Sequence, residues 1–398
     1  MKKFTNFSFN MCTHIVFGKD TVKQVGNLIK MHGGTKVMFV YGNFIKTSGL
    51  YDKIAEYLKE EKISFVELTG IKPNPRRSLV EKGLKYAQSE NVDFMLAVGG
   101  GSTIDTAKAI ALGLASNGTY WQFFNGEEPK KMIPVGAIST IASSGSETSG
   151  SIVLLDDIES NRKIGNMYPI CRPVFAIMDP ELTYSLPKFQ TGLGAADMFA
   201  HTFDRYFIDS ASFLGDQYCI GTMKTAIKYG SIAVNDPKNY EARAELMLTA
   251  SFAHNDVTGI GRSGTRKGSS HGLESQLSGI YDTPHGAGIA AVMPAWLDYL
   301  VDYGEDVHVS RVAQFAVDVF DVPAMMDDKK ATAKEGIRRL RHWLKSLEMP
   351  LTLKELGIPK EDLDDIVLKC RSDKDGIQRG FMDLDKKAVR IIFKSILE

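Results

Sequence analysis

The stretch LAVGGGSTIDTAKAI, at residues 96–110, decides the fold that this sequence predicts. An apolar run typical of a buried strand leads directly into Gly99, Gly100, Gly101 and Ser102, and a helical segment follows. Glycines lack a Cβ atom, so backbone N–H groups can approach an anionic oxygen, and the helix N-terminus adds the positive end of its dipole. We therefore expect a diphosphate to bind here, although such turns also occur as plain connections and this one is not GxGxxG.

Short apolar runs rich in β-branched residues alternate with amphipathic stretches around this turn, as far as about residue 185. The runs that predict strands buried on both faces lie at residues 37–41, 94–98, 133–138 and 174–178. Between the strands, Leu50, Ile54 and Leu58 recur at helical spacing. This alternation predicts a parallel sheet with right-handed crossovers.

The pattern changes after Pro187. Helical periodicity without an intervening strand run is found at residues 195–208, 216–229, 240–253 and 331–347. We therefore expect an α/β dinucleotide-binding domain over residues 1–185 and an all-α domain over residues 186–398. The two domains are expected to meet at a cleft near residue 185.

Composition narrows the possible partners. The 398 residues contain 48 basic and 48 acidic side chains, and this balance argues against a nucleic-acid partner. The four cysteines form no CxxC pair, and no stretch of about eighteen apolar residues occurs, so we expect neither a disulfide framework nor a membrane partner. A cytoplasmic protein fits these features best.

Two further loops are expected beside the glycine turn, because parallel strands end at one edge of a sheet. The loop STIASSGSETSG, at residues 139–150, offers hydroxyl and amide donors, although it could also be a solvated turn. Together with the glycine turn it indicates a nucleotide site. After the first predicted strand, Gly42 and Asn43 carry no negative charge that would repel a 2′-phosphate. The cofactor is therefore NADP or NAD, and the neutral loop leads us to favour NADP(H).

Asp197 and His201 stand four residues apart, so on a helix both side chains lie on one face. Alone, such a pair would be read as a helix-surface contact. His271 and His285, however, also lie among small residues that allow close packing around a central atom. One carboxylate and three imidazoles suit Fe(II) or Zn(II), and the spacing does not choose between them. The spacing assigns His254 to neither group, and the remaining histidines are expected to be ordinary core or surface residues.

Several stretches together resemble the iron-activated alcohol dehydrogenase family, in its butanol dehydrogenase-like branch. The matching motifs, which span most of the chain, are IKPNP at 71–75, VGGGSTIDTAKAIA at 98–111, SSGSETSG at 143–150, MDPELTYSLP at 178–187, GAADMFAHTFDRY at 194–206 and HGLESQLSGIYDTPHG at 271–286. The resemblance implies metal and nicotinamide facing each other in the cleft, and a homodimer.

The resemblance also implies roles for individual residues. Its four metal ligands fall on Asp197, His201, His271 and His285. Its pyrophosphate turn falls on residues 99–102, and we add Asp105 from the same segment to the cofactor-binding candidates. Its nicotinamide and ribose contacts fall on Thr140, Ser143, Ser149 and Lys163.

The sequence departs from the family pattern at two places. Members commonly carry a histidine four residues after the first late ligand, where it relays a proton, and this chain has Ser275. A Gly-Asp-Trp run is also usual just before that ligand, whereas residues 264–268 read GTRKG. Ser275 and His254 are therefore our catalytic candidates, and the proton could also travel through water or a ribose hydroxyl.

The expected function is that of a metal-dependent, NAD(P)H-linked alcohol dehydrogenase or aldehyde reductase. Hydride would pass to a short or medium-chain aldehyde whose carbonyl oxygen lies on the divalent metal. Two alternatives stay open. One is a lyase of the dehydroquinate synthase type, and the other is a nucleotide- and metal-binding protein whose catalysis has weakened.

Overall fold

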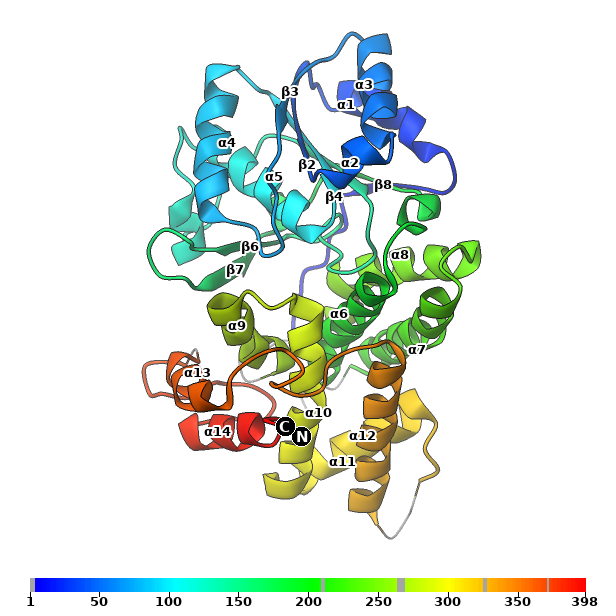
Figure 1. Cartoon of the computed structure of the whole chain (residues 1–398), viewed down its shortest axis with the longest axis vertical. Helices are drawn as coiled ribbons and strands as arrows, with labels where there is room; N and C mark the ends of the chain where they lie inside the picture. Colours follow the sequence, from blue (N-terminus) through cyan, green and yellow to red (C-terminus); the bar gives the residue numbers. More distant parts are fainter. Residues whose placement is uncertain (1–3, 209–211, 263–268, 325–327, 371) are drawn as a thin grey trace. The chain divides into compact units, whose positions relative to one another are not determined.

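The computed structural model of the chain describes residues 4–208, 212–262, 269–324, 328–370 and 372–398 (Figure 1). The chain divides into two compact units. One is Asn10–Ser185, and the other is Leu186–Glu398 together with residues 4–9. The domains expected from the sequence differ from these units in the assignment of residues 4–9. Residues 264–268, where the family pattern changes, lie outside the described part of the chain.

Six parallel strands form the sheet of the first unit, in the order β1-β8-β5-β4-β2-β3. Their bounds are β1 His14–Phe17, β2 Lys36–Tyr41, β3 Ser64–Leu68, β4 Phe94–Gly99, β5 Val135–Ser139 and β8 Phe175–Met178. The four predicted strands are the four central ones. Strands β1 and β3 were not predicted because they are edge strands whose side chains are partly exposed, so neither shows a continuous apolar run.

Helices cover both faces of this sheet. Their bounds are α1 Val25–Met31, α2 Phe44–Thr47, α3 Leu50–Glu60, α4 Arg77–Ser89 and α5 Gly101–Ala115. Successive side chains of a strand point to opposite faces. In β4, Met95 and Ala97 therefore join the core cluster of α4 and α5, whereas Leu96 and Val98 join that of α1 and α3. The parallel α/β architecture predicted from the sequence is confirmed. A separate antiparallel pair consists of β6 Ser151–Leu155 and β7 Lys163–Met167.

Among the described residues of the second unit, helices are the regular elements and no strand forms, as predicted. The helices are α6 Lys188–Tyr206, α7 Phe213–Asn235, α8 Tyr240–His254, α9 Ser270–Tyr281, α10 His285–Tyr303, α11 Asp306–Phe320, α12 Lys329–Ser346, α13 Leu363–Lys369 and α14 Lys386–Lys394. No helix within the described ranges has the length and apolar character needed to cross a bilayer.

Helix α6 is central to this unit because small residues let its neighbours approach closely. A Cβ atom added to Gly230 of α7 would lie 2.8 Å from Cβ of Ala195. At the start of α10, a Cβ atom on Gly286 would lie 2.5 Å from the carbonyl oxygen of Leu193. Glycine is therefore required at both contacts. The close packing holds the first turn of α10 against α6, the helix that carries Asp197 and His201.

Candidate functional site

Four side chains of the helical unit gather around one point. Asp197 and His201 come from successive turns of α6, His271 from the first turn of α9, and His285 is the first residue of α10. One ligand atom from each of Asp197, His201 and His271 lies within 4.8 Å of the others. Oδ1 of Asp197 lies 3.4 Å from Nε2 of His201 and 3.9 Å from Nε2 of His285. The structure therefore brings together the four residues proposed from the sequence.

The chemistry of this cluster fits a divalent cation. Nε2 of His271 is buried and has no hydrogen-bond partner among the described residues, as expected for a nitrogen that faces a metal. Burial lowers the pKa of His201 well below its usual value of 6.5, and His254 and His271 lower it further. A neutral imidazole keeps the lone pair that binds a metal. Three imidazoles with one carboxylate are a donor set that suits both Fe(II) and Zn(II).

Two buried carboxylates hold the far sides of the histidine rings, and the sequence analysis missed both. Nδ1 of His271 lies 2.7 Å from Oδ2 of Asp204, and Nδ1 of His285 lies against Oε2 of Glu274. A carboxylate on Nδ1 fixes the tautomer that leaves Nε2 free for a metal. The sequence spacing could have indicated both carboxylates. Asp204 follows His201 by three residues and Glu274 follows His271 by three, so on a helix each carboxylate lies on the same face as a ligand histidine.

Asp204 is itself held by hydrogen bonds from the start of α9. The hydroxyls of Ser269 and Ser270 each donate to its carboxylate at 2.7 Å. Burial alone would raise the pKa of Asp204, but the charge of His271 and these hydrogen bonds bring it below the usual 3.8. The carboxylate is therefore an anion in a buried setting, placed to accept a hydrogen bond from Nδ1 of His271.

The two catalytic candidates lie in different settings. His254, the last residue of α8, stacks on the His201 ring, with centroids 3.9 Å apart and planes at 16°. Ser275 lies one turn after His271 on the same face of α9, and its hydroxyl donates to the carbonyl oxygen of Gly272 at 3.0 Å. His254 thus contacts a residue of the metal cluster, whereas the hydrogen bonds of Ser275 to Gly272 and Gln276 stay within its own helix.

In the α/β unit, the predicted cofactor loops leave the sheet side by side. Tyr41 of β2 pairs with Val98 of β4, and Gly99 of β4 pairs with Ser139 of β5. The loops that follow therefore start at one edge: the first contains Gly42 and Asn43, the second runs through residues 99–102, and the third carries Thr140, Ser143 and Ser149. The order of strands reverses between β2 and β4, and open α/β sheets bind ligands at such a switch point.

The remaining cofactor candidates surround the third loop. Asp105 of α5 is buried, and both of its carboxylate oxygens accept hydrogen bonds, from Oγ of Ser146 at 2.5 Å and from the amide of Val153 at 3.0 Å. Ser149 is fully buried, and its Oγ accepts a hydrogen bond from the amide of Ser151 at 3.0 Å. Lys163 begins β7 and is partly exposed. Burial raises the pKa of Asp105, and the nearby positive charges of Lys108 and Lys163 lower it by a smaller amount.

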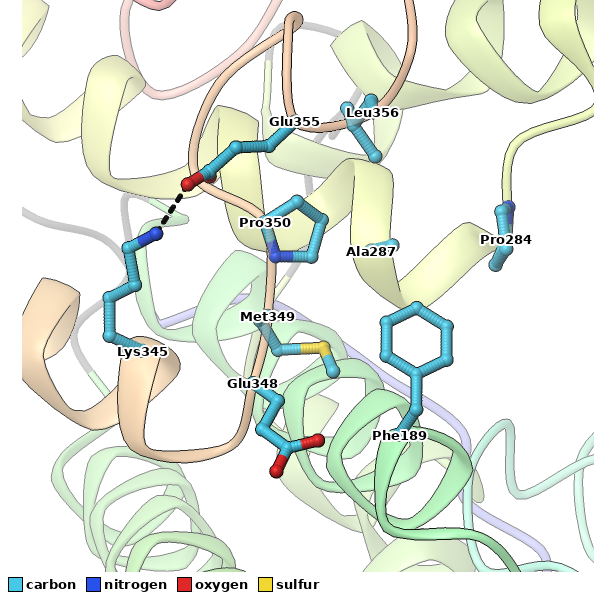
Figure 2. Close-up of a pocket in the computed structure, with 9 residues that line it drawn as sticks. All are labelled: Phe189, Pro284, Ala287, Lys345, Glu348, Met349, Pro350, Glu355 and Leu356. Atoms are coloured by element: carbon cyan, nitrogen blue, oxygen red, sulfur yellow. Dashed lines mark hydrogen bonds and ion pairs between the residues drawn. The ribbon is translucent and has the colours of Figure 1, made fainter.

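A pocket of about 400 Å³ opens in the helical unit beside the first turn of α10 (Figure 2). The pocket is lined by Phe189 of α6, by Pro284 and Ala287 near His285, and by residues of the segment 345–356. The ion pair between Lys345 and Glu355, 2.5 Å long, joins two of its walls. None of its described lining residues belongs to the metal cluster, so it is a separate feature of α10.

Comparison with known proteins assigns both halves of the chain to one family. Residues 12–180 match the family described as iron-containing alcohol dehydrogenase. Residues 191–397 match the carboxy-terminal part of the Fe-containing alcohol dehydrogenase family.

Individual relatives are similar over nearly the full length. The chain is 35% identical to NADH-dependent butanol dehydrogenase A of Clostridium acetobutylicum, over 98% of this chain and 99% of that protein. It is 29% identical to the NADPH-dependent aldehyde reductase YqhD of Escherichia coli, over 92% of each. The crystal structure of NADH-dependent butanol dehydrogenase A from Thermotoga maritima superposes with a TM-score of 0.92 at 34% identity, covering 99% of both chains.

Proposed function

The chain belongs to the iron-containing alcohol dehydrogenase family, and we propose that it reduces short or medium-chain aldehydes with hydride taken from NAD(P)H. It is a metal-dependent oxidoreductase of the alcohol dehydrogenase and aldehyde reductase type. The observation that carries the proposal for this site is the convergence of Asp197, His201 and His271, whose ligand atoms lie within 4.8 Å of one another. His285 is the fourth proposed ligand, and its Nε2 lies 3.9 Å from Oδ1 of Asp197.

In this mechanism the residues that would hold the metal are Asp197, His201, His271 and His285. When bound, the divalent metal stabilises negative charge on the substrate oxygen, and the reduced nicotinamide supplies the hydride. Asp204 keeps His271 in the tautomer whose Nε2 is free of a proton, and the carboxylate of Glu274 lies against Nδ1 of His285. Both carboxylates also add negative charge close to the ligands, which raises the affinity of the cluster for a cation.

The product alcohol needs a proton on its oxygen, and we assign its delivery to His254. The ring of His254 is buried and stacked on His201, so a titratable nitrogen lies one ring away from the metal cluster. An imidazole can accept and release a proton near neutral pH. Ser275 occupies the position where relatives commonly carry a histidine, and its hydroxyl does not titrate in this range. We assign Ser275 the smaller part of helping to order water on that face of α9.

For the cofactor, we propose that the chain accepts both NAD(H) and NADP(H). Similarity to the NADH-dependent butanol dehydrogenases supports NAD(H). The neutral loop at Gly42 and Asn43 supports entry of the 2′-phosphate of NADP(H), and the aldehyde reductase YqhD is NADPH-dependent. For the metal we propose Fe(II), after the description of the matched family, with Zn(II) as the alternative that the same donor set accepts.

The decisive experiment follows oxidation of NADH and NADPH with butanal, on protein whose bound metal has been quantified. Activity should vanish after chelation and return with Fe(II) or Zn(II). His285→Ala should lose activity and bound metal together. A chelated protein that stays active, or His285→Ala that binds no metal yet turns over normally, would refute the metal role. Nicotinamide binding without oxidation would instead favour the weakened nucleotide- and metal-binding protein.

We also propose that the protein is a cytoplasmic homodimer. The exposed aromatic side chains of Phe4, Phe7 and Phe9 support the dimer, because exposed apolar groups clustered along one segment are typical of association surfaces. Light scattering coupled to gel filtration should give twice the mass of 43.9 kDa. A mass equal to that of one chain would contradict this proposal.

A further inference from the structure

Lys108, in the middle of α5, is fully buried, which is rare for a lysine. Its ammonium donates to a cluster of oxygen atoms in and after the third cofactor loop. The acceptors are the carbonyl oxygens of Ser146 at 2.8 Å, Ser149 at 2.9 Å and Ser151 at 2.9 Å, with Oγ of Ser146 at 2.8 Å. Three N–H groups therefore serve four acceptors, and at least one is shared.

Asp105, one turn earlier on α5, completes this buried arrangement. Its carboxylate accepts from Oγ of Ser146, the hydroxyl that accepts from Lys108, so the three side chains form one chain of hydrogen bonds. Oδ1 of Asp105 lies 3.9 Å from Nζ of Lys108 and balances its charge. Since the amide of Val153 donates to Oδ2, the carboxylate also fixes the start of β6, where the loop ends.

The near end of the same loop is fastened to the glycine turn. The amide of Thr140 donates to the carbonyl oxygen of Gly99 at 3.2 Å. A Cβ atom on Gly100 would lie 2.5 Å from Cγ2 of Ile141, and one on Gly101 would lie 2.3 Å from Oγ of Ser144. The loop therefore packs on the turn at one end and is tied to α5 at the other. The glycine turn and α5 are one continuous segment, so the segment that begins with the phosphate turn also sets the shape of the loop.

We infer that Lys108 is a positioning residue for the nicotinamide cofactor, acting with Asp105 to hold residues 146–151 so that Ser149 and its neighbours meet the cofactor in a preformed loop. This inference rests on the proposed function. Asp105 then contributes to cofactor binding through the loop, because both of its oxygens are occupied within the protein. A loop ordered before binding costs less free energy to organise when the cofactor arrives, and affinity rises accordingly.

An ammonium suits this position for a chemical reason. Three carbonyl oxygens that converge on one point are acceptors only, so they cannot satisfy one another, and each one left without a donor destabilises the loop. A tetrahedral ammonium directs three donors to one small region. The guanidinium of arginine is planar and larger, and in a site without free space it cannot reproduce that arrangement. Lys108→Arg is therefore expected to behave like a loss of function.

The first test compares Lys108→Met with the wild type and with Lys53→Met, a control on the exposed face of α3. Lys108→Met should weaken NAD(P)H binding, measured by nicotinamide fluorescence, about tenfold or more. The KM for the cofactor should rise similarly, while kcat and bound metal change little. A lysine that merely stabilised the fold would lower the active fraction and hence kcat, with KM unchanged. Native cofactor affinity in folded Lys108→Met would overturn the inference.

A second variant keeps the inference testable if Lys108→Met fails to fold. Lys108→Ala, refolded with n-propylammonium, should regain cofactor affinity, because that cation replaces the missing part of the side chain. Tetramethylammonium, which has no N–H donor, should not restore it. Equal restoration by both cations, or by neither in folded protein, would overturn the inference. Wild-type protein that binds no nicotinamide would overturn the proposed function instead, which separates the two failures.

Discussion

Nδ1 of His271 lies 2.7 Å from Oδ2 of Asp204, a carboxylate that is only 2% exposed. Asp204→Asn should therefore lower metal affinity about 10- to 100-fold, because a neutral amide accepts the hydrogen bond from Nδ1 less strongly and no longer fixes the tautomer whose Nε2 faces the metal. Competition with a chelator measures the affinity without recourse to activity. Asp306→Asn, which alters an exposed carboxylate, is the control and should bind metal normally. Unchanged affinity in Asp204→Asn would remove Asp204 from the metal site.

Two roles of His254, ring stacking on His201 and proton transfer, can be tested separately. His254→Phe keeps an aromatic ring against His201, whereas His254→Ala removes it. If His254 delivers the proton, both variants should lose about 100-fold in kcat, and His254→Phe should retain its metal. Steady-state kinetics with metal analysis distinguishes the cases. Full turnover in His254→Phe would show that only the stacking contact matters.

Replacing Ser275 with histidine should restore the imidazole common in the family. Ser275 lies one turn after His271, so the new ring extends from the same face of α9. We expect kcat to rise about tenfold and its pH profile to gain a titration near neutral pH. Ser275→Asn provides a polar side chain that does not titrate. An equal change in both variants would mean that shape, and not proton transfer, is responsible.

Gly42→Asp should shift cofactor preference toward NAD(H). A Cβ atom at Gly42 meets no atom within 4 Å, so the aspartate fits without displacing the backbone. Its charge would accept hydrogen bonds from the ribose hydroxyls and repel a 2′-phosphate. The ratio of kcat/KM for NADH to that for NADPH should rise about tenfold or more. Gly42→Asn, similar in size but neutral, should leave the ratio near that of the wild type; a matching rise there would contradict the electrostatic explanation.

The stability contributed by Asp216 should depend on pH. Burial raises the pKa of Asp216, but hydrogen bonds and charge from Arg311 and Arg262 lower it below the usual 3.8. A lowered folded-state pKa means that the contribution is complete above 3.8 and is lost as pH falls through the folded pKa. Asp216→Asn should lower the free energy of unfolding by about 3 kcal/mol at neutral pH. Urea titrations should show that difference shrinking below pH 3.8, and a difference independent of pH would contradict it.

The sequence predicted features that repeat or that require particular residue types. Central strands such as β4 were predicted because both faces are buried, and the four cluster residues because carboxylate and imidazole ligands recurred in suitable settings. Asp204 and Glu274 were missed because a carboxylate in a helical segment is usually on the surface. Lys108 was missed for the same reason. Only the folded chain shows that its ammonium donates to carbonyl oxygens of residues about forty positions later in the sequence. Local sequence patterns do not predict contacts over that separation.

The contact of Gly100 with Ile141 and of Gly101 with Ser144 has a practical consequence for protein engineering. A library intended to alter coenzyme choice by varying only one of these loops would encounter this contact. Here a bulkier residue at either glycine would collide with the opposite loop, and most single-loop variants at these positions would be lost to misfolding. Productive variants should instead carry paired changes, in which a larger side chain at Gly100 or Gly101 is combined with a smaller one at Ile141 or Ser144.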